Sequence, residues 1–484
     1  INDIARNVPV NIIRGNLERI ILKIKEETPK TTLYLQSVLP VNPDFGKFSG
    51  HMKPDSIQYL NTQIEELSRK YSVTYIDLYS HFVESDTQKL SPEFTNDGLH
   101  LLGAGYLHWA KLIQTYIKEE KKMHTTIDKL PDYPIPGGIS APFAGVHQNR
   151  LIIAGGCNFP DIPAADGGKK KFYDNIYYLD TSADKENPLW VKGGGFPHEV
   201  AYGASVSTPD GLICIGGQTS ESPTGDVFRL RFNTSLGKIE TERLPSLPVA
   251  VFNADATLLG NTIYLAGGVS SDGLVNSLYS LNLDNLSAGW KTISTNLESQ
   301  RQQPVVFSHG KELFIAGGYD EHNALVFSDV LLFDFSVNKW CKHADIRLDG
   351  QPMALIGAGS AVTDSGLVLC VGGVNYNRFL AALQRIKRTR EATSSNNLAL
   401  LESLKQEGKV YMNQPVEWYL FNPSLLAFDT KTNKWESLGN FQELARAGAG
   451  IVWNGKELLI VGGEIKPGVR TVTGSRLITL IPSW

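Results

Sequence analysis

The chain has 484 residues, 42% of them hydrophobic, which suits a globular protein of two or three domains. Its 46 basic and 50 acidic residues give a formal net charge of −4, so no excess of positive charge indicates a nucleic acid partner. No apolar run approaches the roughly 20 residues that span a bilayer. The chain opens on "INDIARNVPV" without a signal peptide or an initiator Met, so we expect a processed end or a fragment of a longer protein.

Residues 1–122 are predicted to alternate helix and strand, which is typical of an α/β layer. Apolar residues at helical spacing predict helices in "LERIILKIKEE", "IQYLNTQIEELSRKY" and "YLHWAKLIQTYIKEE". Strands are predicted in "TTLYLQSVLP" and "VTYIDLYSHF". The charged stretch "KEEKKMHTT" follows, and we place within it the boundary between a first domain, residues 1–122, and a second, residues 123–484.

The motif "NDGLHLLGAGY" places Asp97 and His100 three residues apart, just ahead of a predicted helix. A carboxylate at that spacing can fix the tautomer of an imidazole that activates a nucleophile. The opening "IND" supplies Asn2, whose side-chain amide can stabilise an oxyanion. Taken alone, the DGLH motif is more often a helix-capping turn than part of a catalytic site.

Together these residues resemble the C-terminal two-thirds of a GDSL/SGNH-type hydrolase. The resemblance implies Asp97 and His100 as the acid and base of a catalytic triad and Asn2 as an oxyanion donor. The family's nucleophilic Ser lies in an N-terminal G-D-S block, and no G-D-S occurs in residues 1–122. We therefore expect no esterase activity from this segment as it stands. It is either a truncated esterase domain, which we favour, or a scaffold.

Six diglycines, each following an apolar strand-like run, divide the second domain. They are Gly155-Gly156, Gly216-Gly217, Gly267-Gly268, Gly317-Gly318, Gly372-Gly373 and Gly462-Gly463. Their spacing is 50 to 61 residues, except for a last step of 90. Most are followed by a second strand and often by a Trp, as at Trp190, Trp290, Trp340 and Trp435. This period resembles the kelch repeat, and six units predict an all-β, six-bladed propeller.

The last repeat unit ends one strand short of four at Trp484. We predict that "TTIDKLPDYPIP", ahead of the first blade, supplies the missing outer strand. Joining the two termini in one blade would leave no open seam between the first and last blades.

The 90-residue step contains an insertion at about residues 378–419. Apolar residues recur at helical spacing on both sides of "TSSNN", with Gly408 as a helix stop, which predicts a helical hairpin. Its basic residues either face solvent or belong to a lid over the propeller mouth.

The four cysteines form no CxxC pair. They are Cys157, Cys214, Cys341 and Cys370. Cys214 and Cys370 lie in the apolar runs "LICIGG" and "LVLCVGG", where a small buried thiol is expected. We predict neither a disulfide nor a metal site.

Residues just after each diglycine and just before each inner strand are predicted to meet at one end of the central channel, because both positions lie on the same face of an antiparallel blade. The candidates are Cys157, Asn158, Phe159, Gln218, Val269, Tyr319, Asn375, Glu464, Tyr202, Phe252, Asn253, Arg301, Gln302, Gln303 and Arg446. This mixture of amides, aromatics, cations and one carboxylate suits an anionic small molecule such as an acidic sugar.

We select Arg446, Asn158, Arg301, Gln218, Asn375 and Tyr202 as substrate-binding residues, together with Lys466 from the loop "IVGGEIKPGVRT". Each has a competing interpretation. The three amides can instead satisfy loop backbone. Arg301 can be an ordinary rim cation. Glu464 and Arg470 of the same loop can form a surface ion pair without a catalytic role.

The loop "GEIKPGVRT" is similar to the G-E-x-K-P-G-x-R-T loop of the kelch-type N-acetylneuraminate epimerases, or sialic-acid mutarotases. So are "PFAGVHQNRLIIAGGCNF", "GGKKKFYDNIY", and "VAYGASVS" followed by "IGGQTS", over residues from about 123 to 484. Here the Glu-bearing blade comes last, whereas in better-known members it lies in the interior of the chain. In this respect the chain resembles a cyclically permuted branch of the family. The resemblance implies that Glu464 is the proton acceptor and that Arg470 is essential to the site.

Mutarotation of a 2-keto acid sugar removes a proton from the anomeric hydroxyl and delivers one to the ring oxygen. Glu464 would be the general base, and Arg470 either a clamp for the sugar carboxylate or a charge partner of Glu464. Lys466 either tunes Glu464 or faces solvent. The reaction needs no metal, nucleotide or redox cofactor.

Three other functions of propeller proteins fit the residues of this sequence less well. A sialidase would carry Asp-box turns, which we do not find, and a kelch oxidase needs Tyr and His copper ligands, whereas these loops offer few His. A non-catalytic binding propeller is the serious alternative, and a closed pocket would argue against it. The epimerase resemblance implies sialic acid as the partner and a periplasmic location. An esterase-like domain beside a mutarotase would prepare O-acetylated sialic acids for uptake.

Overall fold

The protein forms two compact units, Ile1–Lys122 and Met123–Trp484, and each is described by itself. The structure is a computed structural model that describes residues 1–28, 31–84, 87–114, 116, 125–182, 188–363 and 367–479. Most of the predicted boundary stretch, from residue 118 to residue 124, lies outside the described residues.

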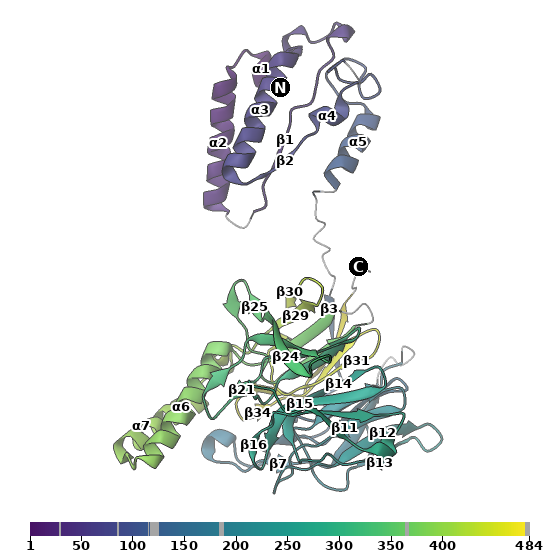
Figure 1. The fold of residues 1–484 in the computed structure, drawn as a ribbon, viewed down its shortest axis with the longest axis vertical. Coiled ribbons are helices and arrows are strands. Elements are labelled where there is room, and N and C mark those ends of the chain that lie inside the picture. The colour runs from purple at the N-terminus through teal and green to yellow at the C-terminus, as the bar shows by residue number, and fades with distance from the viewer. Residues whose placement is uncertain are drawn as a thin grey trace. The chain divides into compact units, whose positions relative to one another are not determined.

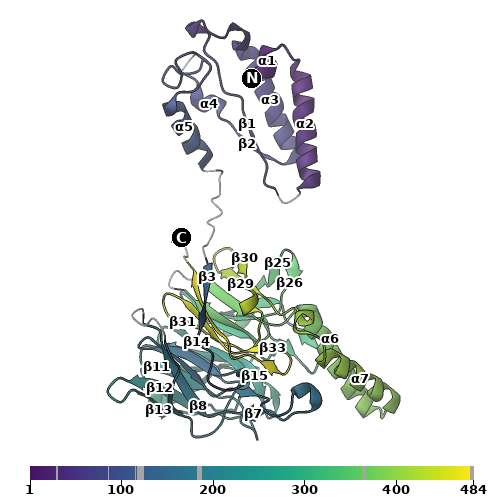
Figure 2. The same cartoon turned by 180° about the vertical axis from the view of Figure 1, so that it is seen from behind.

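The first unit is a small α/β layer. Its elements are α1 (Asn2–Ala5), α2 (Val10–Glu27), β1 (Tyr34–Gln36), η1 (Pro43–Phe45), η2 (Ser49–His51), α3 (Pro54–Tyr71), β2 (Thr74–Ile76), α4 (Tyr79–Phe82) and α5 (Gly103–Gln114). β1 and β2 pair in parallel, which requires a crossover, and α3 provides it. Figures 1 and 2 show α2 and α3 on one side of this sheet and α5 on the other. Buried Ile57, Leu60 and Ile64 of α3 form much of its core.

Both strands of the first unit are shorter than the sequence predicts. The apolar run "VTYIDLYSHF" is strand only to Ile76, and α4 begins at Tyr79. The hydroxyl of Ser37 accepts hydrogen bonds from the main-chain N–H groups of Leu78 and Tyr79, both at 2.8 Å. These bonds occupy the backbone donors that a longer strand would use in its ladder, so the chain turns into a helix instead.

The second unit is a six-bladed β-propeller, which confirms the predicted fold class (Figure 1). The blades of the described residues are β4–β5–β8–β9, β10–β11–β12–β13, β14–β15–β17–β18, β19–β20–β23–β24, β27–β28–β29–β30 and β31–β32–β35–β3, each in spatial order. The first three comprise β4 (Phe143–His147), β5 (Arg150–Ala154), β8 (Asn175–Asp180), β9 (Val191–Gly195), β10 (Ala204–Thr208), β11 (Gly211–Ile215), β12 (Val227–Asn233), β13 (Lys238–Leu244), β14 (Phe252–Leu259), β15 (Thr262–Ser270), β17 (Leu278–Asn282) and β18 (Lys291–Ser294).

The other three comprise β19 (Val305–His309), β20 (Glu312–Ala316), β23 (Asp329–Asp334), β24 (Lys339–Asp345), β27 (Ala358–Val362), β28 (Val368–Gly372), β29 (Ser424–Asp429), β30 (Lys434–Asn440), β31 (Gly450–Trp453), β32 (Leu458–Val461), β35 (Gly474–Thr479) and β3 (Thr125–Leu130). Short strands decorate the loops, namely β6 (Cys157–Asn158), β7 (Lys171–Phe172), β16 (Gly273–Leu274), β21 (Tyr319–Asp320), β22 (Leu325–Val326), β25 (Arg347–Leu348), β26 (Gln351–Pro352), β33 (Glu464–Lys466) and β34 (Val469–Arg470).

The position of a strand in its blade explains its sequence. Second strands such as β11 and β32 are buried along their whole length and are continuous apolar runs, because they are covered on both faces. Outer strands such as β13 and β30 are mostly exposed and polar. The buried clusters lie between neighbouring blades, and one joins Val452 and Leu459 of the sixth blade to Leu151 and Ile153 of the first. Packing therefore continues around the ring.

The sixth blade takes its outer strand from the other end of the domain, as predicted. β3 pairs antiparallel with β35, with Ile127 opposite Leu477 and Leu130 opposite Gly474. Leu130 is buried between the first and last blades. The propeller is thus closed by hydrogen bonds as well as by packing, and no sheet edge is left at the junction.

All twelve diglycine residues have positive φ. At Gly155, with φ +65°, a Cβ atom would lie 2.3 Å from the carbonyl oxygen of Val200, and at Gly462 it would lie 2.6 Å from that of Ile139. The second glycine of each of these pairs donates its N–H to the same carbonyl. The repeat therefore needs glycine because the chain turns left-handed while touching the next blade's backbone.

Between β28 and β29 the chain forms two long helices, α6 (Tyr376–Ser394) and α7 (Leu398–Met412). Figure 1 shows the hairpin, in green, projecting from the propeller. The prediction that Gly408 ends the second helix is wrong, because α7 continues to Met412. A Cβ atom at Gly408 would lie 3.9 Å from Nε of Arg385, so a small residue suits the place where the two helices approach. The remaining short turns are η3 (Ala164–Asp166), η4 (Leu286–Ala288), η5 (Val416–Tyr419) and η6 (Gln442–Leu444).

No helix within the described ranges is long and apolar enough to cross a membrane. The cysteines Cys157, Cys214 and Cys370 are buried and Cys341 is exposed, and all four are free thiols. The buried thiols predicted at Cys214 and Cys370 are therefore confirmed.

Candidate functional site in the propeller channel

A belt of six left-handed residues, one at or just before the start of each inner strand, surrounds the mouth of the channel. They are Ala141, Tyr202, Asn253, Gln303, Gly357 and Gly448, with φ between +48° and +71°. Main-chain hydrogen bonds run around the belt, from Tyr202 N–H to Ala141 O, from Asn253 N–H to Tyr202 O and from Gln303 N–H to Asn253 O, at 2.8–3.0 Å. The belt fixes the side chains at the mouth to a rigid backbone.

A cavity of about 320 Å³ occupies the channel at this belt. All six belt residues line it, as do residues of every first strand, including Ser205, Asp255, Val306 and Ser360. Glu464 lies in its wall. The volume falls within the range of small-molecule sites, and the lining supplies a few polar groups among small residues. A cavity of this kind is better suited to binding a small molecule than to binding the flat surface of a protein partner.

The loop that carries Glu464 and Arg470 is a tight hairpin of β33 and β34. Its register places Glu464 directly opposite Arg470, with the turn between them and Gly468 at φ +80°. Side chains opposite each other on an antiparallel pair lie on the same face. The spacing of six residues therefore brings a carboxylate and a guanidinium together, as cross-strand neighbours rather than as an accidental surface pair.

Arg470 lies behind Glu464. Its Nη2 is 2.7 Å from Glu464 Oε1, and its side chain is 2% exposed whereas that of Glu464 is 26% exposed. Arg470 Nε also donates to Ser140 Oγ at 3.1 Å, and the guanidinium lies 4.7 Å from the ring centre of Phe159. Of the two roles left open by the sequence, this geometry favours a charge partner of Glu464 over a clamp for the sugar carboxylate.

The electrostatics of Glu464 suit a general base. Burial raises the pKa of its carboxyl above the ordinary value, and the charges of Arg470 and Lys170 oppose the increase. A carboxylate whose proton affinity is increased, while cations keep it ionised, accepts a proton more readily near neutral pH.

The two predicted substrate-binding arginines do not line the cavity. Arg301 is completely buried, and its guanidinium donates to Gly317 O and to Asp329. Arg446 Nη1 donates to Gly462 O and Thr473 O, and burial lowers its pKa to about 10. Each one binds a main-chain carbonyl of a neighbouring diglycine turn. Arg301 is therefore not an ordinary rim cation, and the substrate-binding role of both residues stays a prediction.

The amides selected from the sequence also lie outside the cavity lining. Asn158 donates to Pro136 O and Gly138 O and accepts from the Tyr173 hydroxyl. Asn375 caps α6 by accepting from Arg378 N–H. Gln218 forms a main-chain bridge with Ala201. For Asn158 and Asn375, the competing interpretation, in which an amide satisfies loop backbone, describes the structure.

Lys466 and the helical insertion are joined. Lys466 Nζ donates to Gln414 O, just after α7, at 2.9 Å. Tyr411 of α7 lies close enough to Glu464 for that carboxylate to help raise the pKa of the phenol to about 12, although burial is the main cause. The base of the insertion thus borders the Glu464 loop, whereas outer residues such as Lys405 and Lys409 face solvent.

Three polar residues that the sequence did not single out belong to this site. Asp255 lines the channel, where burial raises the pKa of its carboxyl to about 7. Ser140 holds Arg470. Lys170 donates to the hydroxyl of Tyr202 at 2.8 Å. A carboxylate within an inner strand was a usable signal for Asp255, but no sequence pattern distinguishes Lys170 from its two neighbouring lysines.

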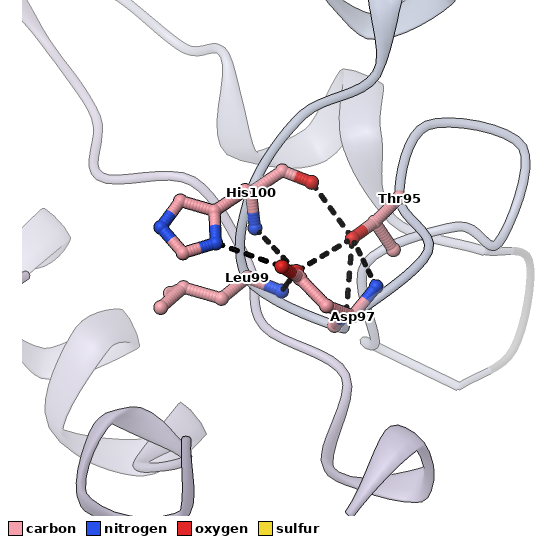
Figure 3. A network of polar contacts seen from close by, with 5 residues as sticks. Thr95, Asp97, Leu99 and His100 are labelled. Carbon is pink, nitrogen blue, oxygen red and sulfur yellow. Dashed lines mark hydrogen bonds and ion pairs between the residues drawn. The ribbon is translucent and has the colours of Figure 1, made fainter. Parts of the chain in front are cut away.

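The first unit contains a second polar cluster, drawn in Figure 3. Asp97 Oδ2 lies 2.8 Å from His100 Nδ1, and Asp97 Oδ1 accepts from the N–H groups of Leu99 and His100. The main-chain and side-chain hydrogen bonds from His100 hold the pKa of Asp97 well below its usual range. The imidazole is 65% exposed. A carboxylate thus orients an accessible imidazole, as the DGLH motif predicts.

Asn2 is connected to His100 through two residues, His51 and Phe48. Its Oδ1 is 3.2 Å from His51 Nε2, and the ring of Phe48 contacts those of His51 and His100. Phe48 has φ +52°, a costly conformation for an aromatic residue. His51 and Phe48 were not predicted, since nothing in the sequence pairs them with Asn2.

Two family models match parts of the chain. Residues 244–479 match the N-acetylneuraminate epimerase model, and residues 1–107 match the GDSL-like lipase/acylhydrolase model. The C-terminal half therefore resembles N-acetylneuraminate epimerases, and the N-terminal region is GDSL-hydrolase-like.

Curated relatives agree with the first match. The N-acetylneuraminate epimerase of Haemophilus influenzae (strain PittEE) is 30% identical over 246 residues, which is 50% of this chain and 60% of the relative. That of Yersinia enterocolitica is 28% identical over 242 residues, 49% of this chain and 58% of the relative. The chain thus spans about 60% of the length of the relatives it matches. A solved structure titled "Structure of YjhT" has a TM-score of 0.50 and 17% identity, covering 73% of this chain and 97% of that one, and it supports the fold alone.

Proposed function

We propose that the propeller is a sialic-acid mutarotase, which interconverts the α- and β-anomers of N-acetylneuraminate by opening and reclosing the sugar ring. One observation carries the proposal: Glu464 lies in the wall of a cavity of about 320 Å³, with the buried cation Arg470 as its cross-strand partner. The similarity of residues 244–479 to N-acetylneuraminate epimerases indicates the sugar.

The reaction follows from these groups. Glu464 removes the proton of the anomeric hydroxyl, the bond from the anomeric carbon to the ring oxygen breaks, and the ring oxygen takes a proton as the ring opens to the ketone. Rotation about the bond next to the carbonyl presents its other face to the attacking hydroxyl, and the ring closes as the second anomer. The charge of Arg470 keeps Glu464 ionised before the proton is taken. The mechanism uses only side chains of this chain.

The remaining parts of the proposal rest on resemblance. The order of the blades, with the Glu464 loop last, corresponds to a cyclic permutation of the epimerase propeller. The first unit is an O-acetylesterase-like domain with His100 as its base and Asp97 orienting it. Removal of O-acetyl groups and anomer conversion would both prepare sialic acids for uptake, and we place both in the periplasm.

The test is proton NMR of freshly released α-N-acetylneuraminate, followed with the wild-type chain and with Glu464→Gln. We expect the wild type to accelerate conversion to the β-anomer and the variant to lose about 10²-fold or more, since general-base catalysis is worth about 10²–10⁴. Glu436→Gln, on the exposed outer strand β30, is the matched control and should retain the rate.

A folded wild type that gives no acceleration over buffer would overturn the mutarotase function. Calorimetric titration with N-acetylneuraminate would then show whether the cavity is a binding site only. If Glu464→Gln retains the full rate of an active wild type, the base is another residue.

A further inference from the structure

Mutarotation needs a second proton-transfer group. When Glu464 takes a proton from the anomeric hydroxyl, the ring oxygen must receive one as its bond to the anomeric carbon breaks. Glu464 supplies the base for one side of this exchange. The following inference rests on the proposed function and concerns the group that supplies the acid.

Tyr202 is held at the cavity by the belt. Its φ of +61° is a costly conformation for an aromatic residue, and the belt bonds on both its N–H and its C=O hold it there. Tyr202 and Glu464 line the same cavity. The two groups therefore reach one bound ligand from different blades.

The hydroxyl of Tyr202 receives two hydrogen bonds. Lys170 Nζ donates to it at 2.8 Å, with the ammonium 4.6 Å from the ring centre, and Cys157 Sγ donates to it at 3.3 Å. An ammonium has donors only, so it can occupy a lone pair of the phenol but cannot accept its hydrogen. The Cys157 thiol has one hydrogen and also lies 3.7 Å from Ser140 O, so its sulfur can instead accept weakly from the phenol, and the O–H hydrogen stays available to a stronger acceptor on a ligand. Among the described residues, the weakly accepting Cys157 sulfur is the acceptor that contacts it.

The surroundings suit an acid that is regenerated. Burial raises the pKa of Tyr202, and the nearby Cys157 and Glu464 raise it further, so the phenol keeps its proton at neutral pH. Once the proton has left, the phenolate is formed beside the Lys170 ammonium, which stabilises it by a charge-assisted hydrogen bond.

We propose that Tyr202 is the general acid of the mutarotase and that Lys170 is its positioning residue. Glu464 takes the anomeric hydroxyl proton while the bond from the anomeric carbon to the ring oxygen breaks and Tyr202 protonates that oxygen. The products are the open-chain ketone, the Glu464 carboxylic acid and the Tyr202 phenolate. On closure Tyr202 recovers its proton as the hydroxyl attacks the carbonyl, and Glu464 returns a proton to the carbonyl oxygen. Both groups end in their starting states.

The first test is Tyr202→Phe, which removes only the hydroxyl, followed by the NMR assay at a pH where the wild-type rate no longer changes. We expect a loss of about 10²-fold or more. Added imidazolium should partly restore the variant's rate in proportion to its concentration and leave the wild type unchanged, because an external acid replaces the missing group. Tyr264→Phe, on β15 against Phe335, is the matched control.

The second test is a double-mutant cycle. Lys170→Met should slow the reaction and Lys170→Arg should recover part of it, whereas Lys169→Met, the neighbouring exposed lysine, should not change it. In the Tyr202→Phe background, at a pH where Glu464 stays ionised without the Lys170 charge, Lys170→Met should cost nothing more, because the remaining effect of Lys170 acts through the phenol. Additive losses would overturn its role as a positioning residue.

The outcomes separate this inference from the proposed function. If the wild type does not accelerate mutarotation, the function itself fails. If the wild type is active and Tyr202→Phe retains its rate, or loses it without response to imidazolium, the assignment of the acid is overturned. Loss of the rate in Asp255→Asn, with imidazolium response there and full activity in Tyr202→Phe, would assign the acid to Asp255 instead.

Discussion

Glu464 shows how one residue receives its properties from three elements. Its hairpin places Arg470 opposite it, the belt places Tyr202 at the same cavity, and the loop before β7 brings in Lys170. Burial raises the pKa of Glu464 while the two cations lower it. The pKa of Glu464 can therefore be changed by removing one neighbouring charge at a time.

Arg470→Met should shift the pH dependence of the reaction. Without the Arg470 charge the pKa of Glu464 rises further, so less of the base is ionised at a given pH. Because the base acts when ionised, the rising acid limb of kcat/KM should move to higher pH. NMR rates across the acid to neutral range measure this shift. Arg476→Met is the control, because Arg476 pairs with Glu457. A lower rate with an unmoved limb would make Arg470 a substrate ligand only.

Asp255 is expected to make the stability of the propeller depend on pH. Its folded pKa of about 7 lies above its ordinary value of 3.8, because burial outweighs hydrogen bonds from Val306 and Ala256. The folded protein therefore retains a proton that the unfolded chain loses, and the stability due to this group is lost as pH rises from about 4 to 7. At about 1.4 kcal/mol per pH unit, the loss is at most on the order of 4 kcal/mol.

Asp255→Asn should remove this dependence, since an amide oxygen can still accept from Val306 N–H. Thermal unfolding at about pH 5 and about pH 8, on either side of the folded pKa, should show a smaller decrease in Tm for Asp255→Asn than for the wild type. Asp128→Asn, on the exposed face of β3, should behave as the wild type does. An equal decrease in Asp255→Asn and the wild type would mean that other groups govern the pH dependence.

At the scale of elements, the diglycine turn is the recurring unit. It lies at or near the end of each second strand and contacts the next blade, so the same residues help to end the strand and to join two blades. Arg301 and Arg446 add a guanidinium to such turns by binding Gly317 O and Gly462 O. This architectural use explains why two arginines close to the mouth do not reach the ligand cavity.

Gly155→Ala should destabilise the propeller more than Gly237→Ala. The two glycines have nearly equal φ, +65° and +61°, and this conformation costs alanine about 1–2 kcal/mol at either site. Only at Gly155 would the new Cβ meet a backbone atom, at 2.3 Å from Val200 O, whereas Gly237 has open space. Urea unfolding would measure the difference. Equal losses would show that backbone conformation alone, and not contact between blades, requires glycine there.

At the scale of the whole molecule, the two units have separate cores and separate polar clusters. The residues that line the channel cavity lie between Ser140 and Glu464, and the Asp97–His100 pair lies in the first unit. Closure by β3 ties the start of the propeller to its end. The propeller chemistry is therefore expected to proceed without the imidazole of the first unit.

His100→Ala in the full chain should leave the mutarotation rate within about two-fold of the wild type, because His100 is not among the residues that line the channel cavity. Proton NMR of α-N-acetylneuraminate measures this, and Asp97→Asn is the companion variant. A marked loss in both variants would show that the Asp97–His100 pair contributes to the propeller reaction.

Repeated features and local contacts could be predicted from the sequence alone. Six diglycines predicted six blades, a short last unit predicted closure by β3, and the DGLH motif predicted the contact between Asp97 and His100. These succeed because glycine turns and residues three apart in a loop are constrained by the local backbone. The Glu464 loop was likewise visible as a motif, and its hairpin explains the spacing.

Which residues share the cavity depends on contacts between blades, and these appear only in the folded structure. Arg301, Arg446 and Asn158 were predicted to bind substrate because of their position beside the strands. In the structure each one donates to nearby main-chain carbonyls. The sequence analysis did not select Asp255, which lines the cavity, or Lys170, which donates to Tyr202 from another blade. The direction of a side chain at a blade end depends on the hydrogen-bond partners that other blades supply, and no local pattern encodes those partners.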